Sequence, residues 1–161
     1  MKKLIVIALA VVMALSVVAF AACGGAQTVE GEYSYKNAWD KTGTQSYGAK
    51  VTVTVKGGVI TSVEVAADTD TFFNLSSGWT DKSKWENGEK AMIDSFVGLT
   101  VKEVKAIKVT CDTETNSEAH TVKGQPTKIE GAPANLKVVS GATQSSGRLI
   151  LAVQDALEHL A

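Results

Sequence analysis

The chain has 161 residues, 45% of them hydrophobic, and its 16 lysines and arginines stand against 17 aspartates and glutamates. This length favours one domain. Two of the lysines and no acidic residue lie in residues 1–22, so the rest of the chain carries a net charge of about −3. That balance, without a basic stripe interleaved with aromatic residues, argues against nucleic acid as a partner.

The N-terminus has the features of a targeting segment. Lys2 and Lys3 precede an almost unbroken apolar run over residues 4–20, which is the layout of a secretory signal peptide. The sequence FAAC at residues 20–23 resembles the lipobox at which bacterial lipoproteins are cleaved and acylated, although Phe20 replaces the usual aliphatic residue. This resemblance implies a diacylated Cys23 that holds the protein in membrane lipid. A secretory peptide with an incidental cysteine and a plain transmembrane anchor are the alternatives.

We therefore expect three segments: a signal peptide at residues 1–22, a lipidated cysteine with a tether at residues 23–30, and a domain at residues 31–161. The protein would be lipid-anchored to the cell membrane at its extracytoplasmic face. With Cys23 acylated, Cys111 has no intramolecular partner, and we interpret it as a small buried residue on a strand.

Period-two alternation of valine and threonine predicts a β-hairpin near the start of the domain. Its turn is Gly57-Gly58, and the spacing of Tyr33 and Tyr35 predicts an edge strand ahead of it. The valines expected to mark the inner face are Val51, Val53, Val55, Val59, Val63 and Val65.

Residues 68–88 show no sustained period and predict a long loop. A helix should follow, with Gly98 as its C-terminal cap and an apolar face made of Met92, Ile93, Phe96 and Val97. A capping box from Thr100 to Glu103 predicts a second, short helix that buries Val101, Val104 and Ile107.

The segment KAIKVTCDTETN predicts a further strand, and the next stretch, which contains Pro126 and Pro133, is interpreted as a loop. Three- and four-residue spacing predicts a final helix. Its inward residues are Leu149, Ile150, Val153, Leu157 and Leu160, and its outward residues are Arg148, Gln154, Asp155 and Glu158. The fold class is therefore α+β, an antiparallel sheet packed by two or three helices that include a C-terminal one.

The sequence SGATQSSG at residues 140–147 brings small and hydroxylated residues to the start of that helix. A helix begins with unpaired backbone N–H groups and the positive end of its dipole, so it attracts a phosphate there. Gly141 and Ala142 let a ligand approach the backbone, and the polar candidates for binding it are Ser140, Thr143, Gln144, Ser145 and Ser146. An ordinary N-cap with additional serines is the alternative.

The stretch VVSGATQSS resembles the attachment motif of the FMN-binding domain family, found in the C subunit of the sodium-translocating NADH:quinone reductase, the G subunit of Rnf complexes and bacterial surface lipoproteins. The upstream GEYSYKNAW and GAKVTVTVKGGVITSVEV are similar to the family's opening strand and hairpin, so the resemblance covers about residues 31–160. It implies FMN as the cofactor, joined to Thr143 as a phosphoester by a flavin transferase. It also implies an electron carrier rather than a self-sufficient enzyme, supplied by a membrane reductase or a quinone-linked donor.

One position departs from the family's pattern. Lys137 stands where the family has an aspartate, three residues before the serine, and the resemblance implies that this acid assists the flavin transferase. FMN bound without a covalent bond therefore stays open, since a lysine also attracts phosphate. A flavin-free surface or binding lipoprotein that keeps the same fold is the second alternative.

Other chemistries find less support in the sequence. His120 and His159 have no recognisable triad context, so we expect no catalytic residue. The acidic stretches that begin at Asp68 and Cys111 lack the features of an EF-hand loop, and no cysteine cluster is present, so no metal site is expected. The tryptophans could stack on a flavin or pack within the domain, with packing favoured; they are Trp39, Trp79 and Trp85.

Overall fold

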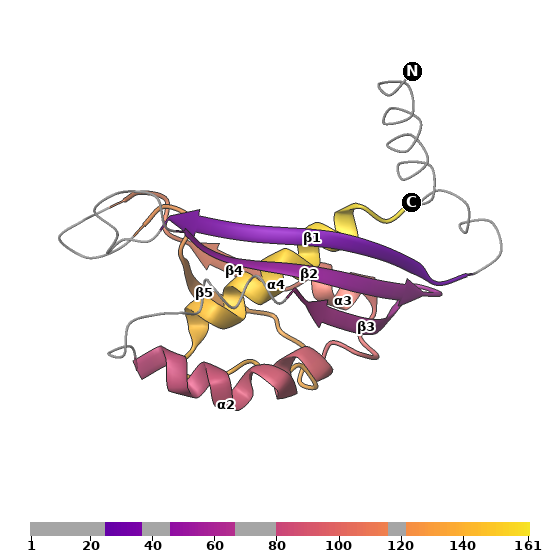
Figure 1. The fold of residues 1–161 in the computed structure, drawn as a ribbon, viewed down its shortest axis with the longest axis horizontal. Coiled ribbons are helices and arrows are strands. Elements are labelled where there is room, and N and C mark those ends of the chain that lie inside the picture. Colours follow the sequence, from indigo (N-terminus) through magenta and orange to yellow (C-terminus); the bar gives the residue numbers. More distant parts are fainter. Residues whose placement is uncertain (1–24, 37–45, 67–79, 116–121) are drawn as a thin grey trace, which may run out of the picture.

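The computed structural model describes residues 25–36, 46–66, 80–115 and 122–161. These residues form two antiparallel sheets and three helices, the last of them C-terminal, so the predicted α+β class is confirmed (Figure 1). In chain order the elements are β1 (Gln27–Lys36), β2 (Ser46–Lys56), β3 (Val59–Val65), α2 (Thr80–Asp94), α3 (Val101–Lys105), β4 (Lys108–Cys111), β5 (Pro126–Glu130) and α4 (Thr143–Glu158).

The strands β2 and β3 form the hairpin that the sequence predicts. Gly57 and Gly58 have φ angles of 59° and 76°, and a two-residue type I′ turn requires positive values at both positions. Val53 lies opposite Val63 across the hairpin. The inward valines of β2 are all buried, namely Val51, Val53 and Val55.

The inner face of β3 differs from the prediction at its start. Ile60, and not Val59, is fully buried, because the register of the β2–β3 pair shifts just after Thr54. Such a bulge changes the phase of alternation, so Ile60 and Val63 reach the same face in spite of their odd spacing. Val59 instead forms an isolated bridge with Thr100, beside α3.

The strand β1 is an edge strand, as expected, because the sheet order is β1-β2-β3. It begins at Gln27, so the predicted tether of residues 23–30 is too long and the domain starts earlier than residue 31. The physical reason is Val29, which is 8% exposed and packs in the core, so this part of the chain is held in the sheet.

Two side chains of α4 bond to the outer edge of β1. The Glu32 N–H donates to Asp155 Oδ2 at 2.9 Å, and His159 Nδ1 donates to the Glu30 carbonyl at 2.7 Å. Between them, Gly31 approaches α4 so closely that a Cβ at this position would overlap the backbone of the helix. Strand and helix are therefore fixed against each other in antiparallel directions.

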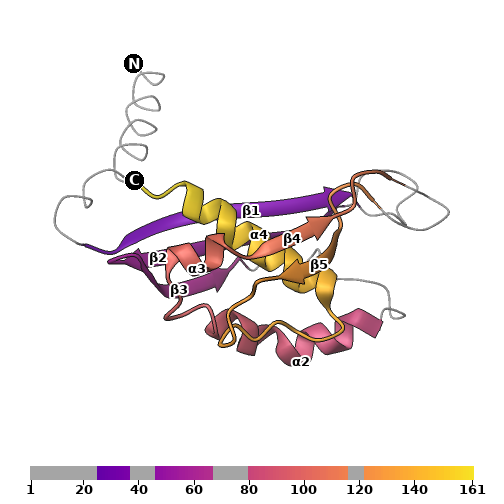
Figure 2. The same ribbon diagram turned by 180° about the vertical axis from the view of Figure 1, so that it is seen from behind.

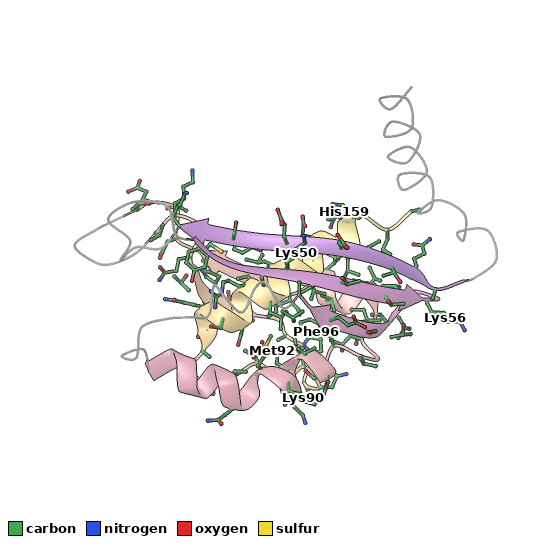
Figure 3. The ribbon with its side chains drawn as sticks, viewed as in Figure 1. Lys50, Lys56, Lys90, Met92, Phe96 and His159 are labelled. Carbon is green, nitrogen blue, oxygen red and sulfur yellow. The ribbon has the colours of Figure 1, made fainter. Side chains whose placement is uncertain are left out.

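The helix α2 begins at Thr80, so the predicted loop of residues 68–88 is wrong from residue 80 onward. The first turns of α2 are polar and carry no apolar period, and the sequence pattern therefore gives no helical signal there. The C-terminal half packs on the domain: Met92 is fully buried, and Gly88 lies against Val139 (Figure 3).

The chain leaves the helix after Asp94 and turns. Phe96 is fully buried, but Val97 is 50% exposed, so the prediction that both lie on one buried face is wrong for Val97. Gly98 has a φ of 91°, a left-handed value that glycine adopts without strain, and its N–H donates to the Ile60 carbonyl at 2.9 Å. This turn joins the end of α2 to the hairpin.

The capping box predicted for α3 is present. Thr100 Oγ1 accepts from the Glu103 N–H at 3.2 Å, and Glu103 Oε2 accepts from the Thr100 N–H at 2.8 Å. The Thr100 N–H, and the Thr100 hydroxyl that donates to the same oxygen at 2.8 Å, hold the pKa of the Glu103 carboxyl below its usual value. Of the apolar residues predicted to face inward, Val104 and Ile107 are buried and Val101 is half-buried.

The strand β4 lies in the segment predicted to be a strand, but its partner β5 lies in the stretch interpreted as a loop. Pro126 is the first residue of β5, a position at which a strand tolerates the missing N–H. The loop prediction for this stretch is therefore wrong, because a proline can begin a β-strand as well as interrupt one.

The helix α4 packs across the inner face of the three-stranded sheet, with β5 beside its N-terminal half (Figures 1 and 2). Of the predicted inward residues, Leu160 is half-buried and the others are buried, namely Leu149, Ile150, Val153 and Leu157. Among the predicted outward residues Glu158 is exposed, and Gln154 and Asp155 are half-buried. Arg148 contradicts the prediction, because it is fully buried.

Candidate functional site

The predicted anion site lies where the chain enters α4. Gly141 has a φ of 75°, Ala142 is the N-cap residue, and Thr143 is the first residue of the helix. Ala142 makes no side-chain hydrogen bond to the first turn, in contrast to the serine or threonine that commonly caps a helix. A helix start of this kind offers its first N–H groups to an acceptor outside the helix.

The hydroxyl groups of the motif do not all face the same environment. Ser145 is 3% exposed and its Oγ accepts from Arg148 Nη2 at 2.9 Å. Ser146 is fully buried and its Oγ accepts from the Val139 N–H at 3.2 Å. Both side chains therefore bond within the fold, and the Ser146 N–H is also bonded, to the Ala142 carbonyl at 2.9 Å.

The remaining hydroxyls lie at the surface. Ser140 and Gly141 are exposed, and Thr143 is half-buried. Ala142 has no exposed surface, its N–H donates to the Val139 carbonyl at 3.1 Å, and its carbonyl accepts from Ser146 at 2.9 Å. The backbone beneath Thr143 is thus fixed on both sides, while the threonine itself stays accessible.

Gln144 links the motif to the far end of β1. The Tyr35 hydroxyl donates to Gln144 Oε1 at 3.5 Å, a long hydrogen bond, and Tyr35 is only 5% exposed. The contact joins positions that lie 109 residues apart in the chain. It locates the start of α4 beside the last residues of β1.

Arg148 lies beneath the same site and was missed by the sequence pattern. Its guanidinium carbon is 5.9 Å from the centroid of the Tyr35 ring, a cation–π distance. Arg148 belongs to a stretch of α4, from Ser145 to Ile150, that is buried on every side. The helical spacing of the apolar residues therefore does not predict that Arg148 is buried. The run of small residues Ser145, Ser146 and Gly147 is the available signal, because such residues allow neighbouring elements to surround a helix.

The charge of Arg148 affects the chemistry of the site. A guanidinium is always protonated, and here it lies close to the positive end of the α4 dipole. The helix dipole favours negative charge at the start of the helix. The first turn of α4 is therefore suited to hold an anion.

A second polar cluster lies further along β1. The Tyr33 hydroxyl donates to the Gly124 carbonyl at 2.6 Å and lies 3.6 Å from Cys111 Sγ. Burial, together with the neighbouring Cys111 thiol and Tyr35, raises the pKa of Tyr33 above its usual value. Cys111 is a half-buried free thiol, somewhat more accessible than the buried strand residue expected.

Lys137, which departs from the family motif, is exposed just before the site. Its backbone N–H donates to Ser95 Oγ at 2.9 Å, and Ser95 Oγ donates to the Met92 carbonyl at 2.7 Å. These bonds hold the segment that precedes the motif against the end of α2. A side chain at position 137 is therefore presented to solvent from a fixed backbone.

Several predicted residues lie outside the described residues: Cys23, Trp39, Asp68, Trp79 and His120. Trp85 is on α2, but its side chain is not described. His159 bonds to β1 at the opposite end of α4 from Thr143. In the part of the chain that the structure covers, no three His, Cys, Asp or Glu side chains are grouped to hold a metal ion.

An open groove with a volume of about 370 Å³ lies along α4 but away from Thr143. It is lined by Lys105, Ile107, Lys108, Val109, Leu151, Gln154 and Glu158. The side-chain amide of Gln154 is already hydrogen-bonded there, since its Nε2 donates to the carbonyls of Val104 and Ile107. This groove is separate from the predicted anion site.

Among the described residues, no helix is both long and apolar enough to cross a membrane. Compared with protein-family models, curated proteins and solved structures, the chain gives no match.

Proposed function

We propose that this chain is a lipoprotein, anchored at the extracytoplasmic face of the cell membrane, that binds FMN through Thr143 and carries electrons. The observation that carries the proposal is Thr143 itself, a half-buried threonine at the first position of a helix whose N-cap has no capping side chain. FMN, when bound, supplies chemistry in which one or two electrons are taken up and released.

The residues around Thr143 fit a phosphate group. The first N–H groups of α4 and its dipole favour an anion, and the buried Arg148 donates to Ser145 Oγ in the first turn of the same helix. Gly141 is exposed and carries no side chain that could obstruct the approach. Thr143 Oγ1 is the atom that would form the phosphoester, and Gln144, held by Tyr35, lies next to it.

Lys137 decides between two modes of FMN binding. An ammonium group from this exposed position favours a phosphate electrostatically, whereas the flavin transferase of the family relies on an acid there. The proposal therefore includes FMN attached to Thr143 and FMN held at the same place without a covalent bond. Acylation of Cys23 would keep the protein on the membrane in either mode.

The partners follow from this assignment. A flavin transferase would attach the cofactor, and a membrane reductase or a quinone-linked donor would supply the electrons. A covalent cofactor suits an extracytoplasmic protein, because a reversibly bound one is lost when its free concentration falls below its dissociation constant. Nucleic acid has no place in the proposal, given the net charge of about −3 after residue 22.

The test is to produce the protein together with a flavin transferase and measure its intact mass. The wild type should gain the mass of an FMN phosphoester and remain fluorescent on a denaturing gel. Thr143→Val should lose both signals because it keeps the shape and removes the oxygen, and Thr143→Ser should keep at least part of them. Thr113→Val, which alters an exposed threonine outside the motif, is the control and should behave as the wild type.

Lys137→Asp completes the experiment. A rise in the flavinylated fraction would identify the missing acid as limiting for the transferase. Flavin that co-purifies but is lost on denaturation would support non-covalent binding at the helix start. If neither the wild type nor Lys137→Asp acquires flavin in any form, the electron-carrier proposal fails, and a flavin-free lipoprotein with this fold replaces it.

A further inference from the structure

The distance between the anchor and the domain limits how the domain can sit on a membrane. The strand β1 begins at Gln27, four residues after Cys23. Even a fully extended chain spans only about 14 Å over these four steps. If Cys23 is acylated, as the proposed function requires, the beginning of β1 is held close to the lipid headgroups.

The end of the domain that contains Gln27 is built from three connections. Gln27 pairs with Val55, next to the Gly57-Gly58 turn, and the Val101 N–H of α3 donates to the Gly58 carbonyl at 3.0 Å. The turn after α2 reaches the same place. We call this region the anchored end; it comprises the start of β1, the β2–β3 turn and the segment from Val97 to α3.

The exposed side chains at the anchored end include lysines that suit an anionic lipid surface, together with one carboxylate on α3, that of Glu103. Lys56 projects from the tip of the hairpin (Figure 3), and Lys102 is exposed on α3. Val97, at 50%, is the exposed large hydrophobic residue found among the described residues. Lysine side chains attract anionic headgroups, and an exposed valine loses little by entering the headgroup region.

The Thr143 site lies at the other end of the domain. Gln144 contacts Tyr35, whereas His159 contacts Glu30, so α4 runs back along β1 towards the anchored end. From Gln27 to Tyr35 the strand rises about 26 Å. The 16 residues of α4 span about 24 Å, which agrees with that separation.

The outer face of the sheet gives a bilayer no apolar surface on which the domain could lie flat. Its side chains include Thr28, Glu30 and Lys50, which are all exposed, and the neighbouring Thr52 and Thr54 are polar as well. Contact through the anchored end leaves these groups in water, whereas contact through the sheet would dehydrate the two charged ones.

We propose that the domain stands on its anchored end against an anionic phospholipid surface and presents the Thr143 site to the aqueous phase. Electrons then reach the site from a water-exposed partner, either a soluble molecule or the extracytoplasmic part of a membrane reductase. A quinone dissolved in the bilayer is too far away to be the direct donor. The assignment of a redox partner rests on the proposed function, but the orientation does not depend on flavin.

Orientation can be tested with the full lipidated chain in vesicles of phosphatidylglycerol and phosphatidylcholine. Fluorophores are attached to single cysteines, Lys56→Cys at the anchored end and Lys123→Cys beside Gly124 at the far end, both in a Cys111→Ser background. Lipids with a quencher in the headgroup should quench the label at position 56 and leave that at position 123 bright. Iodide in the water should quench the label at position 123. Equal lipid quenching at both positions would overturn the orientation.

Two further measurements separate this inference from the proposed function. Cys23→Ser should abolish lipid quenching at position 56, and unchanged quenching in that variant would contradict the anchor on which the orientation depends. Where the wild type carries flavin, its absorbance should bleach more rapidly with a water-soluble reductant than with a quinol confined to the vesicles. Equally rapid bleaching by the quinol would refute the water-exposed partner while leaving flavin binding intact.

Discussion

Replacement of Gly31 by alanine should strongly destabilise the domain. Gly31 is where β1 crosses α4, and an added Cβ would lie 2.6 Å from Ala156 Cα and closer still to Ala156 N and the Ala152 carbonyl oxygen. These are backbone atoms of a helix, so they cannot move aside as the end of a flexible side chain can. Either the strand or the whole helix must shift.

The size of the effect follows from the cost of overpacking. Inserting a methyl group into a close-packed site costs about 1–3 kcal/mol, and a clash with rigid backbone belongs at the upper end of that range or beyond it. We therefore expect a loss of about 3 kcal/mol in the free energy of unfolding. At roughly 4 °C per kcal/mol for a domain of this size, the unfolding midpoint should fall by about 12 °C.

The assay is thermal and denaturant unfolding of the domain without its lipid anchor, followed by circular dichroism. Gly48→Ala is the matched control on the neighbouring strand, since a Cβ at position 48 meets nothing closer than 3.2 Å. The free energy of unfolding of Gly48→Ala should stay within about 1 kcal/mol of the wild type. Alanine lowers the conformational entropy of the unfolded chain, which stabilises the fold, and the tight contact at position 48 offsets that gain. Equal stability of the two variants would refute the close crossing of β1 and α4.

Two further predictions concern ionisable groups. Tyr33→Phe should cost about 1 kcal/mol at neutral pH through the lost bond to the Gly124 carbonyl. Because the folded state raises the pKa of Tyr33 above its ordinary value of 10.0, the stability of the wild type should fall as the pH rises above 10, and the stability of the variant should fall less. Unfolding curves over that pH range check this, and equal losses of stability in the two proteins would contradict it. Thr100→Ala should cost about 1 kcal/mol by removing the cap of α3. The pKa of Glu103 lies below its ordinary value of 4.5, so the stability that its carboxylate contributes is present above pH 4.5 and is lost as the pH falls through the folded pKa. The difference in stability between wild type and variant should therefore become smaller in acid. A difference that does not change with pH would contradict a link between the cap and the Glu103 carboxylate.

The predictable parts of the fold are those with a strong local signal. The Gly57-Gly58 turn and the capping box of Thr100 and Glu103 are each determined by residues that are close together in the sequence, and both are present. The start of α2 has no such signal, since its first turns are polar and the buried Met92 comes only near its end. The strand β5 depends on pairing with β4, which a local pattern beginning with Pro126 does not reveal.

The candidate site was predictable in position but not in its internal arrangement. The motif around Thr143 does begin a helix, and its small residues do bring the chain into a tight turn. The inward direction of Ser145 and Ser146 depends on β5 and on the segment before the motif, which surround the first turns of α4. Arg148 is buried for the same reason, and its contacts with Tyr35 and Ser145 help to hold the charged side chain there.

If many copies share one membrane, as the proposed anchor implies, the bonds from Asp155 and His159 to β1 bear on how those copies meet. An edge strand normally offers its free N–H and C=O groups to another strand, and molecules confined to a surface meet far more often than molecules in solution. Here the Glu32 N–H and the Glu30 carbonyl are already bonded within the chain, in the middle of the exposed edge. A second strand that adds to β1 at this point would have to displace these two bonds, which disfavours strand-by-strand association there.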